Sequence, residues 1–176
     1  MRARITALLA CALLAAACAG EEVRRTYYAN GKPWSEIRYA NGQPEGVWTT
    51  WHESGRKERE GAYVAGFQHG TWRVWAEDGT CLLEADYEKG RPEGLWIERW
   101  ENGHEKYRGR YVDRRPDGLW VESYDNGQKS IEGTYVEGKR DGMWRSWNRD
   151  GSFKGEARFE KGLLKPKDRA EDGTPK

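Results

Sequence analysis

The sequence predicts an all-β protein, a single-layer antiparallel β-meander built from tandem 24-residue β-hairpin repeats. A Gly-x-Trp motif recurs at this period, at Gly46 and Trp48, Gly70 and Trp72, Gly94 and Trp96, Gly118 and Trp120, and Gly142 and Trp144. An aromatic column keeps the same phase, at Tyr39, Tyr63, Tyr87, Tyr111, Tyr135 and Phe159. A second glycine column also keeps it, at Gly31, Gly55, Gly79, Gly103, Gly127 and Gly151. Self-similarity at one fixed period is typical of repeat proteins, in which each repeat contacts only its neighbours.

The composition fits a thin sheet better than a thick globular core. Of the 176 residues, 36% are hydrophobic and 34% are charged, yet the chain has ten Trp and nine Tyr. So many aromatic residues argue against a disordered chain. The formal net charge is +1, and the repeats carry no long run of either sign. Because nonspecific nucleic-acid binding needs concentrated positive charge, we expect no nucleic-acid partner.

The N-terminus predicts export. Residues 1–17 combine two arginines with an apolar run that is too short to span a bilayer, which is typical of a signal peptide. The small residues before Cys18 resemble a bacterial lipobox, although Ala15 stands where a larger aliphatic residue is usual. We expect lipidation of Cys18 and a lipid anchor at the cell envelope, facing the periplasm or the cell exterior. A cleaved signal with a passive cysteine is the alternative. With Cys11 removed in the signal peptide and Cys18 lipidated, Cys81 would have no disulfide partner within the chain.

After a short linker at 18–22, the repeat domain is expected over 23–162. Hairpin turns are predicted at Asp78-Gly79, Asn102-Gly103, Asn126-Gly127 and Asp150-Gly151, because Asn, Asp and Gly tolerate positive φ. The other connection, for example Asn41 to Gly46, reads as a longer turn that contains the proline, since proline cannot donate to a strand ladder. About twelve strands of roughly eight residues fit between the turns. Residues 163–176 are expected to form a disordered polar tail.

The strands alternate with period two, as half-buried strands do. Two positions before each column aromatic lies a small residue, at Gly61, Ala85, Gly109, Gly133 and Ala157. We predict that a tryptophan from the adjacent strand covers this small residue and fixes the register. Trp51 follows Trp48 by three positions, so either the two rings point to opposite faces or a bulge intervenes.

The pattern Tyr63-x-x-Gly66-x-x-x-Gly70-x-Trp72, repeated in phase, resembles the MORN repeat and, more closely, the bacterial MORN-variant proteins. Further matches to the variant signature are Asn126-Gly127, Gly133-Thr-Tyr135 and Gly142-Met-Trp144. The resemblance covers about residues 22–162, with Arg114 in place of a glycine and Arg24 in place of a tryptophan. Many bacterial members are classed as antitoxins of toxin–antitoxin pairs. The resemblance therefore implies an antitoxin-like or immunity-like role, which rests on the family alone.

No catalytic, cofactor-binding or metal-binding residue is predicted. His52, His69 and His104 fall in three different columns of the repeat, so they do not converge on a metal ion. Cys81 lies in the pattern of the aromatic face and reads as a buried, inert thiol. Acidic residues recur directly before the glycine of the Gly-x-Trp motif, at Glu45, Glu93, Asp117 and Asp141. Solvated turn residues are a simpler interpretation of these acids than a calcium site.

These observations favour a non-enzymatic scaffold that binds protein partners and is itself a monomer. Two alternatives use exposed Trp and Tyr side chains: a glycan or cell-wall binder, and a module that binds phospholipid surfaces. A contiguous row of solvent-exposed aromatic rings across several repeats would favour these alternatives. Buried rings that hold a one-layer sheet together would favour the scaffold.

Overall fold

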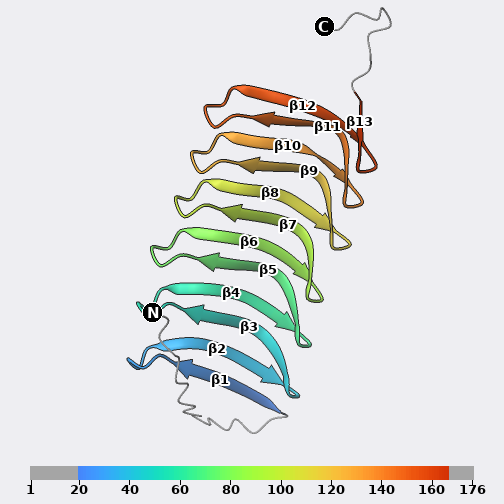
Figure 1. Cartoon of the computed structure of the whole chain (residues 1–176). Coiled ribbons are helices and arrows are strands. Elements are labelled where there is room, and N and C mark those ends of the chain that lie inside the picture. The colour runs from blue at the N-terminus through green and yellow to red at the C-terminus, as the bar shows by residue number, and fades with distance from the viewer. Residues whose placement is uncertain (1–19, 167–176) are drawn as a thin grey trace, which may run out of the picture. The chain divides into compact units, whose positions relative to one another are not determined.

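The computed structural model describes residues 20–166, which form antiparallel strands joined by short turns (Figure 1). The strands are β1 (Glu21–Tyr27), β2 (Pro33–Ala40), β3 (Gln43–Trp51), β4 (Lys57–Val64), β5 (Phe67–Trp75), β6 (Cys81–Glu88), β7 (Arg91–Arg99), β8 (Glu105–Val112), β9 (Arg115–Ser123), β10 (Lys129–Val136), β11 (Lys139–Trp147), β12 (Phe153–Glu160) and β13 (Leu163–Lys165). Their order in the open sheet follows their order in the chain. The predicted all-β meander of successive hairpins is confirmed. Residues 20–166 contain no helix that is long and apolar enough to cross a bilayer.

The predicted domain limits need two corrections. β1 begins at Glu21, inside the segment predicted as a linker, because Glu21 already pairs with Ala40. β13 lies inside the segment predicted to be disordered, because Leu164 pairs with Phe159 of β12. The predicted signal peptide, the lipidated Cys18 and residues 167–176 of the predicted tail lie outside the described residues.

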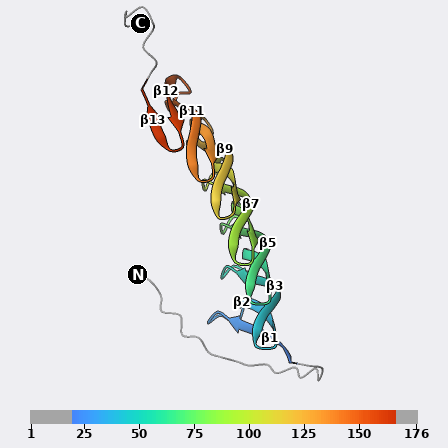
Figure 2. The ribbon, with the colours of Figure 1, turned by 90° about the vertical axis from the view of Figure 1, so that its right-hand side faces the viewer.

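The chain divides into two compact units. The first runs to Gly94 and includes 101–103, and the second comprises 95–100 and the residues from His104 onward. The first unit holds β1 to β6, the second holds β8 to β13, and the boundary falls within β7. Within each unit, each strand pairs with its neighbours in the chain and the strands lie in a single layer (Figure 2).

The loops of the second glycine column take positive φ only at the glycine, for example 84° at Gly151. The preceding acid or amide acts through its side chain instead. The Asp150 carboxylate accepts a hydrogen bond from the Ser152 backbone amide at 2.8 Å, and Asp78 accepts one from Thr80 at 2.8 Å. These bonds, with one from the Ser152 hydroxyl, lower the pKa of both carboxyl groups. The hairpins form as predicted, but Asp contributes an acceptor and not a positive φ.

The connection that was predicted to be longer is in fact the tighter one. Only Asn41 and Gly42 separate β2 from β3, and their φ angles of 51° and 77° fit a type I′ turn. Pro44 therefore lies inside β3, which corrects its assignment to the turn. The ladder of β3 with β4 begins only at Gly46, so the missing N–H of Pro44 costs no bond there, and its carbonyl accepts one from Gly66.

The glycine of the Gly-x-Trp motif marks a bulge that the sequence pattern did not reveal, at Gly46, Gly70, Gly118 and Gly142. All five motif glycines have positive φ, from 68° at Gly70 to 101° at Gly94. Across one such bulge, Ile37 pairs with Trp48 and Tyr39 pairs with Pro44, so β3 carries two more residues than β2. Positive φ explains why the motif uses glycine.

The tryptophan and tyrosine columns form one row of rings in each unit, which we call the aromatic ladder. In the first unit Tyr63 packs edge-on between Trp48 and Trp72, with ring centroids 6.4 and 5.1 Å apart. In the second unit the row continues without a break through Trp96, Tyr111, Trp120, Tyr135, Trp144 and Phe159. Edge-to-face packing of this kind is favourable for aromatic pairs.

The tryptophans also cover three of the five small residues named from the sequence, as predicted. A Cβ built on Gly61, Gly109 or Gly133 would lie well under 3.0 Å from a tryptophan ring of the following strand. Trp72 and Trp144 are only 6% and 5% exposed. The aromatic ladder therefore takes the role of a hydrophobic core in this thin sheet.

Of the two explanations offered for the Trp48–Trp51 spacing, the structure shows the first, that the rings point to opposite faces. Thr50 pairs with Arg59 and Trp51 with Lys57, so an extra residue bulges from β4 and not from β3. With β3 regular at this point, Trp48 and Trp51 point to opposite faces.

Candidate functional site

The face opposite the aromatic ladder carries exposed apolar side chains, which we call the outer strip. All but Phe67 immediately precede or follow a residue of the tryptophan or tyrosine column, so the period-two alternation places them on the opposite face. In the first unit they are Val23, Val47, Val64 and Phe67, and in the second they are Val112, Leu119, Val136 and Met143. Val47 is 60% exposed and Leu119 is 59% exposed. Polar residues are expected on the solvent face of a one-layer sheet, so this row needs an explanation.

In the first unit, strand pairing brings members of the strip together. Val47 pairs with Ala62, and Val64, two residues further along β4, pairs with Phe67. The Phe67 ring extends toward Gly90 of the next turn, where an added Cβ would lie 3.5 Å from it. Val47, Val64 and Phe67 therefore form one apolar surface over β3 to β5.

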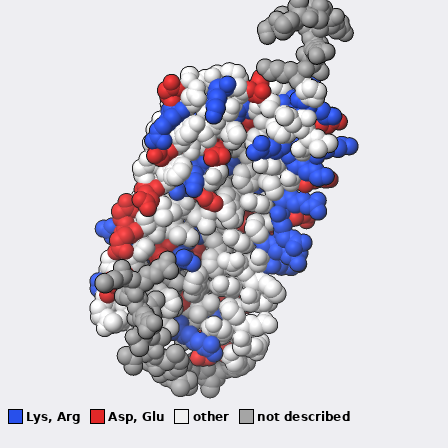
Figure 3. Space-filling model, in the orientation of Figure 1, with Lys and Arg blue, Asp and Glu red and all other residues white. Residues whose placement is uncertain are grey.

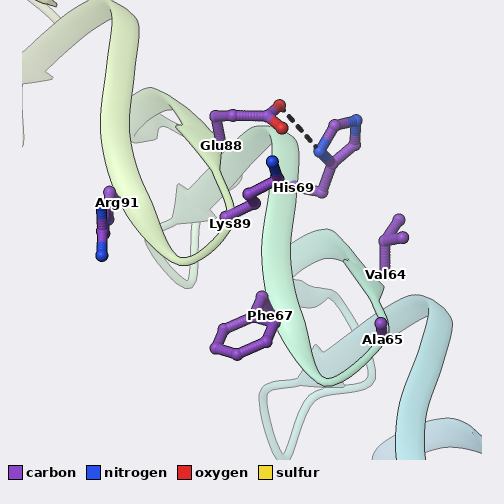
Figure 4. Close-up of a pocket in the computed structure, with 7 residues that line it drawn as sticks. All are labelled: Val64, Ala65, Phe67, His69, Glu88, Lys89 and Arg91. Atoms are coloured by element: carbon purple, nitrogen blue, oxygen red, sulfur yellow. Dashed lines mark ion pairs between the residues drawn. The ribbon is translucent and has the colours of Figure 1, made fainter. Parts of the chain in front are cut away.

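A shallow pocket of about 480 Å³ lies at the turn side of this surface (Figure 4). Its apolar part comes from Val64, Ala65 and Phe67, and its polar rim from His69, Glu88, Lys89 and Arg91. His69 Nδ1 lies 3.0 Å from a Glu88 carboxylate oxygen. An apolar surface with charged groups of both signs at its rim is the usual make-up of a protein-binding patch.

The second unit repeats the arrangement. Leu119 pairs with Thr134, two residues before Val136 on the same face of β10. Beside them, Arg110 donates to Asp117 at 2.8 Å across β8 and β9. Aliphatic side chains flanked by an ion pair thus occur on the same face in both units.

Charges on the strip's face are balanced. Cross-strand ion pairs link Arg25 to Glu36, Arg73 to Glu84 and Arg145 to Glu156. At these three places on the strip's face, each positive side chain is thus balanced by a negative one across the strands. In Figure 3 both signs of charge occur among uncharged surface, and Lys and Arg gather along the right-hand edge.

Two of the three histidines, His52 and His104, contact backbone carbonyl groups of the following repeat. The His52 ring lies 2.9 Å from the carbonyl oxygen of Trp75, and the His104 ring 2.7 Å from that of Asp125. His52 belongs to a column of side chains that bond to the carbonyl 23 residues further on, together with Tyr28, Trp100 and Tyr124. Sequence reasoning missed this column because its members share a donor group and not a residue type. Within residues 20–166, no three His, Cys, Asp or Glu side chains cluster as a metal site would require.

The structure changes the interpretation of Cys81 and makes that of the turn acids more specific. Cys81 is half-buried, not buried, and pairs with Trp75 beyond a bulge, which takes it off the ladder face. The acids before the glycine column support turns: Glu45 accepts from the Ala65 amide at 2.8 Å, and Asp141 accepts from the Lys161 amide at 3.1 Å. Both amides belong to residues with positive φ.

The exposed aromatic side chains do not form a row. Among residues 20–166, only Tyr27, Phe67 and Phe153 are counted as exposed, and they stand in three different columns of the repeat. Every tryptophan in that part of the chain is at least partly buried. The contiguous row of exposed rings that would favour a glycan or lipid surface is therefore not found there.

A comparison with protein families finds the MORN repeat variant at two places, residues 23–41 and 116–137. The first segment spans the β1–β2 hairpin and the second the β9–β10 hairpin. They end at Asn41 and Glu137, in the same column of the 24-residue period, so the match respects the phase of the repeat. No curated protein shows significant similarity to the chain. Repeats of this kind suggest a scaffold for binding proteins or membranes.

Proposed function

We propose that this protein is a non-enzymatic scaffold that binds a protein partner along the outer strip. The observation that carries the proposal is the row of exposed aliphatic side chains on the face opposite the aromatic ladder. The ladder already stabilises the sheet, so stability does not require Val47 or Leu119 to be apolar. Covering them with a partner removes apolar surface from water, which is the main driving force of association.

A protein fits this surface better than a membrane or a glycan does. Adsorption to anionic lipid needs clustered Lys and Arg, whereas the charges here are paired across strands. Binding of sugar rings needs exposed aromatic rings, whereas the rings of Trp72, Trp120 and Trp144 pack on the backbone of Gly61, Gly109 and Gly133. Aliphatic residues beside the Arg110–Asp117 and His69–Glu88 pairs are what a polar-rimmed protein interface uses.

The proposal includes the place of action and the class of partner. Lipidation at Cys18 would hold the protein at the cell envelope, where the repeats begin only a few residues further on. The resemblance to MORN-variant antitoxins makes a toxin or effector the first class of partner to test, with the protein acting in an immunity-like role. The chain itself would be monomeric before it binds.

Photocrosslinking in the native host tests the binding face. A photoreactive residue at position 47 or 119 should capture the same envelope or secreted protein, whereas one at position 53, in an exposed loop away from the strip, should not. With the photoreactive residue moved to position 136 of the strip, the double variant Val47→Lys, Leu119→Lys should lose capture at least tenfold, with an unchanged circular dichroism spectrum. Equal capture from positions 47, 119 and 53 would refute the strip as the binding face.

The anchor is tested separately by metabolic labelling with a fatty-acid analogue. The wild type should incorporate the label and fractionate with membranes, and Cys18→Ser should do neither. Cys81→Ser is the matched control and should label like the wild type. Label retained in Cys18→Ser would remove the anchor from the proposal and leave the binding face untouched.

A further inference from the structure

We propose that the C-terminal edge of the second unit docks an extended peptide of a different protein that carries a Gly-x-Trp sequence. The site is the outer edge of β12 from Phe153 to Ala157. It is distinct from the outer strip, and its occupant would add one more strand to the sheet, a known mode of peptide recognition.

The edge is an unfinished repeat. β13 pairs with β12 only at Arg158, Phe159 and Glu160, which is the short segment before the bulge in each earlier repeat. In the preceding repeat β11 continues past the bulge, where Arg145 pairs with Glu132 of β10. One period after Gly142 and Trp144, the sequence has Pro166 and Asp168. Proline cannot take the positive φ of the glycine, and aspartate has no ring to lay on the sheet.

Among the described residues, no tryptophan of a following strand covers the last small residue of the column. Gly61, Ala85, Gly109 and Gly133 are all buried, whereas Ala157, the next member of this column, is half-exposed. The tryptophan that covers Gly133 also donates from its indole to the carbonyl of Thr134, at 3.2 Å. The equivalent carbonyl at the edge belongs to Arg158. The edge of β12 can therefore accommodate a tryptophan ring over Ala157, and the carbonyl of Arg158 can accept a hydrogen bond from its indole.

The earlier repeats define the chemistry of the occupant. It needs a glycine with positive φ, because Gly142 has φ 76° at this point, and a tryptophan two residues later. The residue after the tryptophan would face Glu156, as Arg145 faces Glu132 in the preceding repeat. Glu156 already pairs with Arg145 of β11 at 3.4 Å, so the edge does not require a particular charge at that position. The sequence Gly-x-Trp therefore describes the ligand.

A second copy of the chain does not match this description. Its free N-terminal strand, β1, has Glu22 and Arg24 in the glycine and tryptophan columns. Arg24 donates to Glu22 at 3.0 Å, and its guanidinium lies 4.1 Å from the ring centroid of Tyr39 in the same chain. At this end of the sheet, the Tyr39 ring is thus already covered by a cation–π contact within the chain. The occupant is accordingly a segment of another protein.

The test uses a fluorescent peptide with the sequence of residues 139–147, which is β11 itself, and the full-length chain. Fluorescence anisotropy should show saturable binding, and replacing the first tryptophan of the peptide by alanine should weaken it at least tenfold. In the protein, Ala157→Leu fills the place of the ring and should weaken binding at least tenfold. Ala40→Leu, at a half-buried alanine of β2, is the matched control and should change the affinity less than twofold.

Three results would overturn the proposal. The first is no binding of the peptide to the wild type, and the second is equal binding to Ala157→Leu with an unchanged circular dichroism spectrum. The third is self-association of the wild type, seen by analytical ultracentrifugation and abolished by Ala157→Leu, because the occupant would then be a second copy. Peptide binding that survives Val47→Lys, Leu119→Lys supports a site separate from the outer strip.

Discussion

The indole of Trp144 lies on the backbone of Gly133, so close that a Cβ on this glycine would fall well under 3.0 Å from the ring. The contact joins two neighbouring hairpins, because Gly133 belongs to β10 and Trp144 to β11. Dispersion forces act over the whole ring, while the missing side chain lets the ring approach the sheet. In a one-layer sheet with almost no buried volume, this relationship replaces the core.

The contact predicts that Gly133→Ala destabilises the protein by about 3 kcal/mol, because the added methyl group must displace the Trp144 ring. Gly155→Ala is the matched control. Gly155 lies in the neighbouring β12, has nothing within 4 Å of an added Cβ and does not have positive φ. Its substitution should change the free energy of unfolding by less than about 1 kcal/mol. Equal shifts of the urea midpoint for the two variants would contradict this assignment.

Trp72 and Trp144 are equally buried but differ in one hydrogen bond. Trp144 Nε1 donates to the carbonyl of Thr134, whereas Trp72 Nε1 has no partner among the described residues. Replacing each by phenylalanine removes similar apolar area, but only Trp144→Phe leaves a carbonyl without its donor. We expect Trp144→Phe to cost about 1–2 kcal/mol more than Trp72→Phe. Denaturant titration of both variants measures the difference, and a larger loss for Trp72→Phe would reverse the assignment.

The repeat period and the strand alternation were readable from the sequence because they depend on columns of one residue type. The turns were harder. Positive φ occurs in a column occupied by Asn41, Ala65, Lys89, Asp113, Glu137 and Lys161, which share no side-chain chemistry. The usable signal was the residue after each of them, which is glycine in all but one repeat. Pro44 was assigned to the turn because proline cannot donate a backbone hydrogen bond. A proline is excluded from a strand only where its partner strand needs that bond, and the bulge at Gly46 means that β4 does not need it here.

The outer strip is present in the sequence but has no distinctive signature there. Val47, Leu119 and Met143 share one column, next to the tryptophans, yet valine and leucine are ordinary strand residues. Their meaning depends on exposure, and exposure follows from the sheet being one layer thick. The docking edge at Ala157 is clearer in retrospect, because its signal is the failure of the period at Pro166.

Arg114 occupies the second position of a two-residue turn, where every other repeat has glycine, and it has φ 64°. An L-residue with a side chain pays a steric cost in this region, of about 1–2 kcal/mol. Arg114→Gly should therefore stabilise the protein by about 1 kcal/mol, after allowance for the greater entropy of glycine in the unfolded chain. Gly42→Arg makes the opposite change at the matching position of another repeat, where φ is 77° and nothing lies within 4 Å. It should destabilise by a similar amount. Thermal midpoints of the two variants should move in opposite directions, and a fall in both would contradict the strain argument.

The Asp150 turn should weaken in acid. The Ser152 hydroxyl, followed by the Ser152 amide, holds the pKa of this carboxyl below its ordinary value in the folded protein. The unfolded chain therefore takes up the proton first, so the contribution to stability is complete above the ordinary pKa and is lost as the pH falls through the lower, folded value.

Asp150→Asn keeps an oxygen acceptor for the turn but does not titrate. Between about pH 5 and pH 2, the thermal midpoint of the wild type should fall further than that of Asp150→Asn, since the other carboxyl groups are common to both. Ser152→Ala removes the hydroxyl that lowers the pKa most, so its folded pKa lies nearer the ordinary value, and its excess loss of stability should be smaller and complete at a higher pH than in the wild type. Wild-type and Asp150→Asn midpoints that run parallel over the whole range would show that this carboxylate does not contribute to the stability of the turn.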